Sequence, residues 1–267
     1  MTAPVIPAAT VLLLRDGRDG LEVFMVRRHY EIDSFSGALV FPGGKVDAND
    51  AAPELREFCD GADGLGDVEL QFRVAAIREA FEEAGVLLAR AVGEVALLPA
   101  ARVEALDALR KPLAAGETTL AALCRRENIR LACDRLVRFA HWITPKQQPK
   151  IFDTQFFLAA APTDQVALHD GEETLESAWI GPAHALAEAD AGRRSIVFPT
   201  RTNLGKLARW QDIDAAMAAA AEATVVTVQP QITPHDEGRI MRIPAAADYG
   251  FSEILLRPDS RVIRVIA

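Results

Sequence analysis

Three glutamates stand close together in the segment Arg78–Val86, at Glu79, Glu82 and Glu83. Their spacing of i, i+3 and i+4 places the carboxylates on one face of an α-helix, with side chains roughly 5–6 Å apart. Such closely spaced acids repel one another unless cations lie among them, and oxygen ligands suit Mg²⁺ or Mn²⁺ better than zinc. The spacing therefore predicts a divalent-metal site, with Glu79 as a third ligand or as the group that deprotonates a water. The alternative is a solvated acidic surface.

The opposite face of this segment is apolar, which supports the helix independently of the acids. A helix from about Val68 to Leu88 is predicted, and Gly85 supplies the permissive backbone that a helix end requires. Arg78 adjoins the acidic stripe and could hold one carboxylate through a charge-assisted pair. The apolar stripe that would bury against a sheet consists of Leu70, Val74, Ile77, Phe81 and Ala84.

Candidate phosphate-binding residues lie upstream of the helix. Arg27 and Arg28 end an apolar run, and Lys45 follows the glycine pair Gly43 and Gly44. The cationic side chains could grip phosphates, and the glycine amides could approach a phosphate closely because no side chain intervenes. The alternative for the cations is that they are ordinary charges at strand ends.

Phe41–Lys45 together with Arg78–Val86 resembles the signature of the Nudix superfamily, whose members cleave pyrophosphate bonds in derivatives of nucleoside diphosphates. The interval from Gly44 to Arg78 is longer than in the short family motif, so residues 48–67 are interpreted as an insert within the box. Its aspartate and glycine pairs read as turns and loop. Asp47, Asp50 and Glu54 are the acids that could replace the motif's upstream glutamate, and none has its spacing.

A long insert in this box is similar to that of the coenzyme A diphosphatase branch, of peroxisomal type and with bacterial relatives. Two further segments of the sequence resemble this branch, His141–Pro145 and Phe152–Leu158. The resemblance implies metal-dependent hydrolysis of coenzyme A or acyl-coenzyme A to 3′,5′-ADP and (acyl)phosphopantetheine, with Glu79, Glu82, Glu83 and Arg78 at the catalytic centre. In this superfamily the general base often comes from a distant loop, for which Glu172 and Glu173 are candidates; the alternative is that they solvate a turn.

Three other functions stay open at this stage. Within the enzyme class, ADP-ribose or dinucleotide pyrophosphatase activity is the runner-up. A non-catalytic Nudix module that senses a nucleotide would usually have lost part of the acidic triad, which is complete here. A scaffolding protein that uses the helical insert and the carboxy-terminal arm would show no turnover.

The composition fits a cytoplasmic enzyme with a small nucleotide-type substrate. The chain has 267 residues, of which 50% are hydrophobic, and its net charge of −9 argues against broad nucleic-acid binding. No apolar run is long enough to predict a membrane span. The 3 cysteines and 5 histidines show no zinc-type spacing, so reduced thiols and packed imidazoles are expected. The sequence leaves open whether the protein forms a homodimer.

The elements around these motifs predict an α/β Nudix fold, in which a mixed β-sheet is sandwiched between helices. Residues 1–210 form the expected hydrolase domain, with the box insert at 48–67 and a helical insert at 100–130. Residues 211–267 form a carboxy-terminal helix and a β-rich appendage. The helical insert is expected to break at Lys111–Pro112 and at Gly116, and Leu39–Phe41 is expected to lead into a glycine loop. Strands are expected at 10–15, 21–28, 137–143, 152–160 and 176–180, with further helices at 182–191, 200–208 and 213–223.

Overall fold

The computed structural model describes residues 4–28, 37–165, 167, 174–257 and 262–266. A mixed β-sheet of eight strands forms its centre. The strands are β1 (Val5–Gly17), β2 (Gly20–Arg28), β3 (Leu39–Val40), β4 (Gly43–Lys45), β8 (Val137–Ile143), β9 (Ile151–Ala160), β10 (Thr174–Ile180) and β11 (Thr227–Val228). Their order is β10-β2-β1-β9-β8-β11, while β3 pairs with β2 and β4 pairs with β1.

The apolar run of β1 is continuous because both of its faces are buried. Val11 and Leu13 point into one core, whereas Leu12 and Leu14 point into the other. β1 and β2, both predicted as strands, form a hairpin with Gly17 opposite Gly20 across a tight turn. β1 also lies parallel to β9, which makes the sheet mixed.

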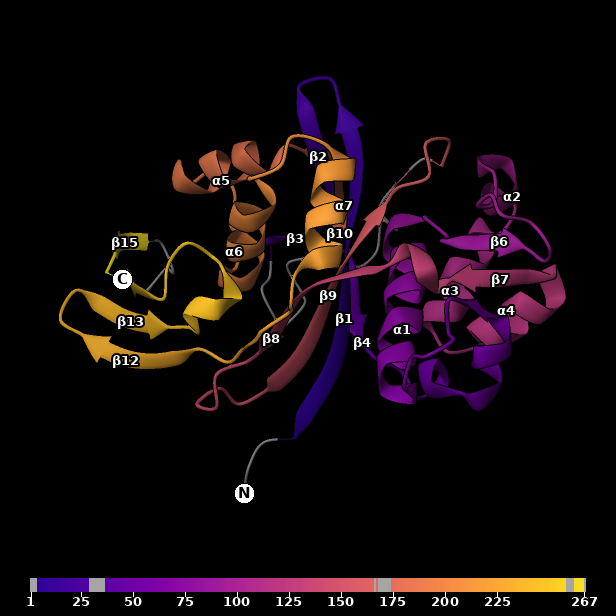
Figure 1. Cartoon of the computed structure of the whole chain (residues 1–267), viewed down its shortest axis with the longest axis horizontal. Helices are drawn as coiled ribbons and strands as arrows, with labels where there is room; N and C mark the ends of the chain where they lie inside the picture. The colour runs from indigo at the N-terminus through magenta and orange to yellow at the C-terminus, as the bar shows by residue number, and fades with distance from the viewer. Residues whose placement is uncertain (1–3, 29–36, 166, 168–173, 258–261, 267) are drawn as a thin grey trace.

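Helices cover the two faces of this sheet. α1 (Asp67–Ala84) packs on one face, and the other face carries α5 (Pro182–Asp190), α6 (Phe198–Leu207) and α7 (Ile213–Glu222). Figure 1 shows the sheet edge-on between the two layers. This arrangement confirms the predicted fold class. In the described part of the chain, no helix has both the length and the apolar composition to cross a membrane.

The two inserts pack together beside α1. The box insert contains the 3₁₀ helices η1 (Ala48–Ala51) and η2 (Pro53–Phe58) and the strand β5 (Cys59–Asp60). β5 joins β6 (Ala89–Ala91) and β7 (Ile129–Ala132) in a sheet with the order β5-β7-β6. The aspartate and glycine pairs do form turns as predicted, at Gly61 and at Asp63–Gly64. Residues 48–60 differ from the predicted loop, because they form two 3₁₀ helices and the strand β5, which pairs with the distant β7.

The rest of the helical insert consists of α2 (Ala100–Glu104), the 3₁₀ helix η3 (Asp107–Leu109), α3 (Arg110–Ala114) and α4 (Leu120–Glu127). The break predicted at Lys111–Pro112 is wrong, since α3 runs through both residues. Proline is tolerated there because an amide in the first turn of a helix has no intrahelical acceptor. Gly116, with φ of +70°, does separate α3 from α4. The predicted glycine loop is also wrong in part, because Gly43–Lys45 is strand β4 and pairs with β1.

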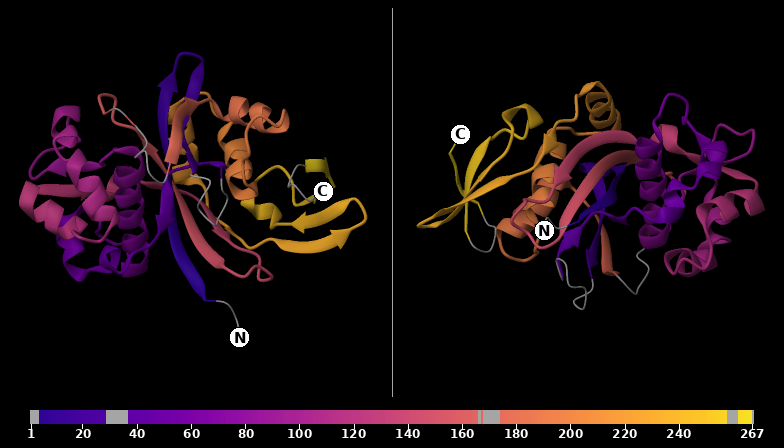
Figure 2. Two further views of the ribbon diagram at one scale, coloured as in Figure 1. Left: turned by 180° about the vertical axis from the view of Figure 1, so that it is seen from behind. Right: turned by 90° about the horizontal axis from the view of Figure 1, so that it is seen from below.

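A second antiparallel sheet ends the chain, as the sequence predicted. Its strands, in the order β12-β13-β14-β15, are β12 (Gln231–His235), β13 (Gly238–Arg242), β14 (Glu253–Leu256) and β15 (Val262–Val265). Figure 2 shows this sheet next to α6, on the side of the molecule away from the inserts. The indole of Trp142 donates to the Tyr249 hydroxyl, which donates to Asn203, both at 2.8 Å. The appendage thus covers the core on the α6 side.

Candidate active site

Helix α1 presents its acidic residues in a buried setting. Glu79, Glu82 and Glu83 are 7%, 8% and 7% exposed, although they lie opposite the apolar stripe that packs on the sheet. β4 and η1 pack against this side of the helix and exclude water from it. The helix ends at Ala84, earlier than the predicted Leu88, because Gly85 has a φ of +67°, the left-handed conformation that favours glycine at a helix end.

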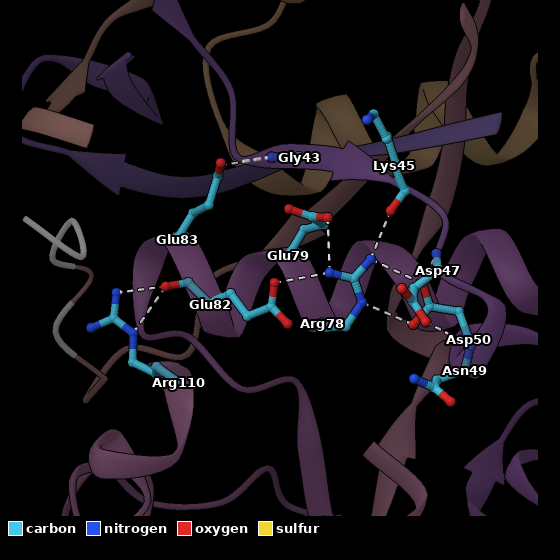
Figure 3. Close-up of polar contacts among 10 residues, drawn as sticks. All are labelled: Gly43, Lys45, Asp47, Asn49, Asp50, Arg78, Glu79, Glu82, Glu83 and Arg110. Atoms are coloured by element: carbon cyan, nitrogen blue, oxygen red, sulfur yellow. Dashed lines mark hydrogen bonds and ion pairs between the residues drawn. The ribbon is translucent and has the colours of Figure 1, made fainter. Parts of the chain in front are cut away.

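Arg78 organises the acidic groups. Its Nη1 donates to Glu79 Oε1 at 2.9 Å and to Glu82 Oε2 at 2.8 Å. Its Nε and Nη2 each donate to one oxygen of Asp50 at 2.9 Å, and Nη2 also donates to the Lys45 carbonyl at 2.8 Å. All five N–H groups of the guanidinium are therefore used. The predicted contact of Arg78 with one carboxylate is in fact a contact with three (Figure 3).

The glycine pair of β4 lies directly over two of the glutamates. The backbone N–H of Gly43 donates to Glu83 Oε2 at 2.9 Å. A Cβ atom at Gly44 would stand 2.6 Å from Glu79 Oε1, closer than real Cβ contacts. A side chain at position 44 would therefore displace the Glu79 carboxylate, which occupies that space.

The buried setting of Glu82 changes its acidity. Burial raises the pKa of Glu82 to about 8, against the lowering effect of Arg78 and together with the raising effect of Glu79. Its Oε1 is buried and has no hydrogen-bond partner among the described residues. Burial alone would lower the pKa of Arg78, but the bonds to Asp50 and the charges of Glu79 and Glu82 raise it above its ordinary value.

Arg110 of the helical insert caps the other end of the site. Its Nε and Nη2 donate to the Glu82 carbonyl at 3.1 and 2.9 Å, near the carboxy-terminal end of α1. A cation at this helix end satisfies a carbonyl and complements the helix dipole. No sequence pattern indicated that Asp50 or Arg110 contacts α1, because each reaches the helix from an insert.

The site fits a divalent cation in charge and in donor chemistry. Three buried carboxylates, Asp50, Glu79 and Glu82, bond to Arg78, and the fourth, Glu83, is held by the Gly43 N–H on the same side of α1. This leaves an excess of negative charge, and one oxygen of Glu82 is unsatisfied. Among the described residues, however, no three acidic, histidine or cysteine side chains converge as a ready-made ligand set. Ligation would therefore require rotation of glutamate side chains now directed at Arg78 and Gly43.

The remaining predicted residues are placed less centrally. The Lys45 side chain is exposed and points away from the glutamates, and only its carbonyl bonds to Arg78 (Figure 3). Arg27 lies near the end of β2 and pairs with Glu176 at 3.5 Å. The Arg28 side chain and the loop acids Glu172 and Glu173 lie outside the described residues. The roles of all these residues stay predictions.

Solved structures of similar architecture identify the class of this domain. The chain is similar to the crystal structure of a NUDIX hydrolase from Alicyclobacillus acidocaldarius, with a TM-score of 0.69 and 27% identity. The match covers 82% of this chain and 97% of that one. The sandwich around α1, with its arginine and three glutamates, is thus a Nudix fold.

The sequence comparisons define the family. The model described as the NUDT19 Nudix domain matches residues 61–206, more than half of the chain. The chain belongs to this family of Nudix hydrolase domains. It is 28% identical to nudix hydrolase 7 of Caenorhabditis elegans and 26% identical to the acyl-coenzyme A diphosphatase NUDT19 of Gallus gallus. Each match covers 72% of this chain but only 57% and 62% of the two relatives.

Proposed function

We propose that this protein is a pyrophosphohydrolase that uses Mg²⁺ or Mn²⁺ and acts on coenzyme A or acyl-coenzyme A. The products would be 3′,5′-ADP and (acyl)phosphopantetheine. The observation that carries the hydrolase proposal is the buried excess of carboxylates on α1 around Arg78, with Glu82 Oε1 unsatisfied. The named activity of the chicken relative supports coenzyme A derivatives as the substrate class.

In this proposal Glu79, Glu82 and Glu83 hold the cation. A bound divalent ion would neutralise charge on the phosphates and lower the pKa of a water at the site. Arg78 fixes the helix face that carries these acids, because its five bonds tie Asp50, the β4 backbone and two glutamates together. Gly43 and Gly44 keep β4 close enough for Glu83 and Glu79 to be held against it.

The chain also contributes to cation binding by excluding water from the site. The glutamates are nearly buried, so a cation among them would be attracted more strongly than at an open surface. The identity of the group that accepts a proton from the attacking water stays a prediction. The candidates are Glu172 and Glu173 on a loop, with Glu79 as the alternative on the helix. The cytoplasmic location and the homodimer are likewise retained only as predictions from sequence.

A product assay tests the proposal. The full chain is incubated with coenzyme A, acetyl-coenzyme A, ADP-ribose or NADH, each with Mg²⁺, with Mn²⁺ or with a chelator. Release of 3′,5′-ADP from the coenzyme A compounds at the highest kcat/KM, abolished by the chelator, is the expected result. Preferred cleavage of ADP-ribose or NADH would favour the runner-up activity. Nucleotide binding without turnover of any compound would favour a sensing module, and neither binding nor turnover would favour a scaffolding role.

A further inference from the structure

A cavity of about 430 Å³ lies at the edge of the central sheet, between α1, the start of β8 and the end of α7. The pairing of the edge strand explains why it is there. β11 pairs with β8 only at His141 and Trp142, so in the described chain no strand covers this edge of β8 before His141. A cavity of this size accommodates a small organic ligand.

Two guanidinium groups lie together at one side of the cavity. Arg138 of β8 is paired across the strands with Phe157, and the Arg73 guanidinium of α1 lies 5.4 Å from the centre of the ring of Phe157. Paired residues of antiparallel strands point to the same face, so both cations are on the α1 side of the sheet. Arg138 Nη2 donates to the neutral Gln155 Oε1 at 3.2 Å, and no carboxylate among the described residues forms an ion pair with Arg138.

Arg73 adds charge to this side of the cavity. Its Nη1 donates to the carbonyls of Cys133 and Leu136, and its Nη2 donates to Glu69 at 3.1 Å. Its Nε is buried and has no hydrogen-bond partner among the described residues. The two guanidinium groups therefore carry two positive charges against the single carboxylate of Glu69, in a chain whose net charge is −9. This local excess of one positive charge attracts a monoanion, and Arg138 is the group with donors to hold it.

The other side of the cavity is apolar. Side chains alternate along β8, so Val137 points away from Arg138 and packs with the core beneath α7, to which Ala220 also belongs. Val225, just after α7, completes this wall. Because the edge of β8 is uncovered here, one ligand can contact the apolar wall and reach around the edge to Arg138.

We infer that this cavity binds an aliphatic monocarboxylate, with its carboxylate at Arg138 and its hydrocarbon chain against Ala220 and Val225. The planar fork of a guanidinium matches a carboxylate in geometry as well as in charge. A phosphate dianion would exceed the single uncompensated positive charge. The cavity shares no residue with the glutamate site, so the inference goes beyond the proposed function and does not depend on it.

Calorimetric titration of the full chain with hexanoate tests the inference, with hexanol, hexylamine and acetate as comparison compounds. Hexanoate is expected to bind at least about tenfold more tightly than each of the others, because only hexanoate has both the negative charge and the apolar chain. Arg138→Gln should weaken hexanoate binding by about tenfold and leave hexanol unaffected. Arg242→Gln is the matched control and should bind as wild type, because Arg242 pairs with Glu253 on the carboxy-terminal sheet.

Thermal unfolding supplies a second readout and verifies that the variants are folded. Hexanoate should raise the melting temperature of the wild type more than that of Arg138→Gln at the same concentration. Glu83→Gln should bind hexanoate as the wild type does, so the failure of the hydrolase proposal and the failure of this site are distinguishable.

Three results would overturn the inference: no binding of hexanoate, equal affinity for hexanoate and hexanol, or an unaltered affinity for hexanoate in Arg138→Gln. Tighter binding of hexyl phosphate than of hexanoate would overturn the assignment of a monocarboxylate.

Discussion

Asp50 and Arg78 form a bidentate ion pair in which both carboxylate oxygens accept a guanidinium N–H at 2.9 Å. Asp50 belongs to the box insert and Arg78 to the catalytic helix, and their side chains are only 2% and 11% exposed. The insert is therefore coupled directly to the residue that also binds Glu79 and Glu82.

Loss of this pair is expected to destabilise the fold. Asp50→Ala leaves the buried charge of Arg78 partly uncompensated, which typically costs about 3–5 kcal/mol of unfolding free energy. Denaturant titration in a chelator measures the change. Asp190→Ala is the control, because Asp190 pairs with Arg201 at the surface with its side chain 62% exposed, and its loss should cost at most about 1 kcal/mol. Equal costs for the two variants would contradict this account.

The two glycines of β4 should respond differently to alanine. At Gly44 the added methyl group meets only the flexible end of Glu79, so the fold should persist while Glu79 moves and turnover falls by about 10²-fold. At Gly43 the methyl group would lie 2.5 Å from the Ala9 carbonyl oxygen and 2.7 Å from the Thr10 Cα. Gly43→Ala should therefore lose at least about 1–3 kcal/mol of stability. Thermal unfolding and a turnover assay of both variants distinguish the effects, and a stable, fully active Gly44→Ala enzyme would refute the first.

Glu83→Gln should separate activity from folding. The amide oxygen can still accept the Gly43 N–H, so the melting temperature should change little. The negative charge needed for a metal ligand is lost, and turnover should fall by at least about 10²-fold. Calorimetric titration with Mn²⁺ should show weaker binding in the variant. If Glu83→Gln turned over substrate at the wild-type rate, Glu83 would be excluded from the catalytic centre.

Glu82 should make the stability of the metal-free protein depend on pH. Its pKa is raised from 4.5 to about 8 in the fold, so the folded state holds more protons than the unfolded state between these values. The stabilising contribution of the proton is complete below pH 4.5 and is lost as pH rises through 8. Glu82→Gln removes this dependence, and its stability relative to wild type should increase with pH across that window.

Denaturant titrations of Glu82→Gln and wild type at several pH values, in a chelator, measure this difference. A difference in unfolding free energy that stays constant from pH 5 to pH 8 would contradict the assignment. Cation binding should also tighten as pH rises through about 8, because a metal competes with the proton on a ligand. Titration of wild-type protein with Mn²⁺ at the same pH values checks the second effect.

The sequence was sufficient to predict those elements whose structure follows from a local pattern of residues. The acidic and apolar faces of α1 follow from a repeat of 3.6 residues, and Gly85 ends the helix because a left-handed residue is needed there. The strands β1 and β2 and the boundaries of β8 were also predicted, because runs of strand-forming residues bounded by turn residues indicate strands. The resemblance to the Nudix signature then supplied the fold.

Only the tertiary structure revealed which groups meet across long intervals. Asp50 reaches Arg78 over 28 residues, and Arg110 reaches the Glu82 carbonyl over another 28. The strand character of Gly43–Lys45 and of Cys59–Asp60 depends on partners in β1 and β7. Local sequence encodes the direction of a side chain relative to its own helix or strand. The identity of its distant partner depends on how those elements pack, and this packing decided which residues form the site.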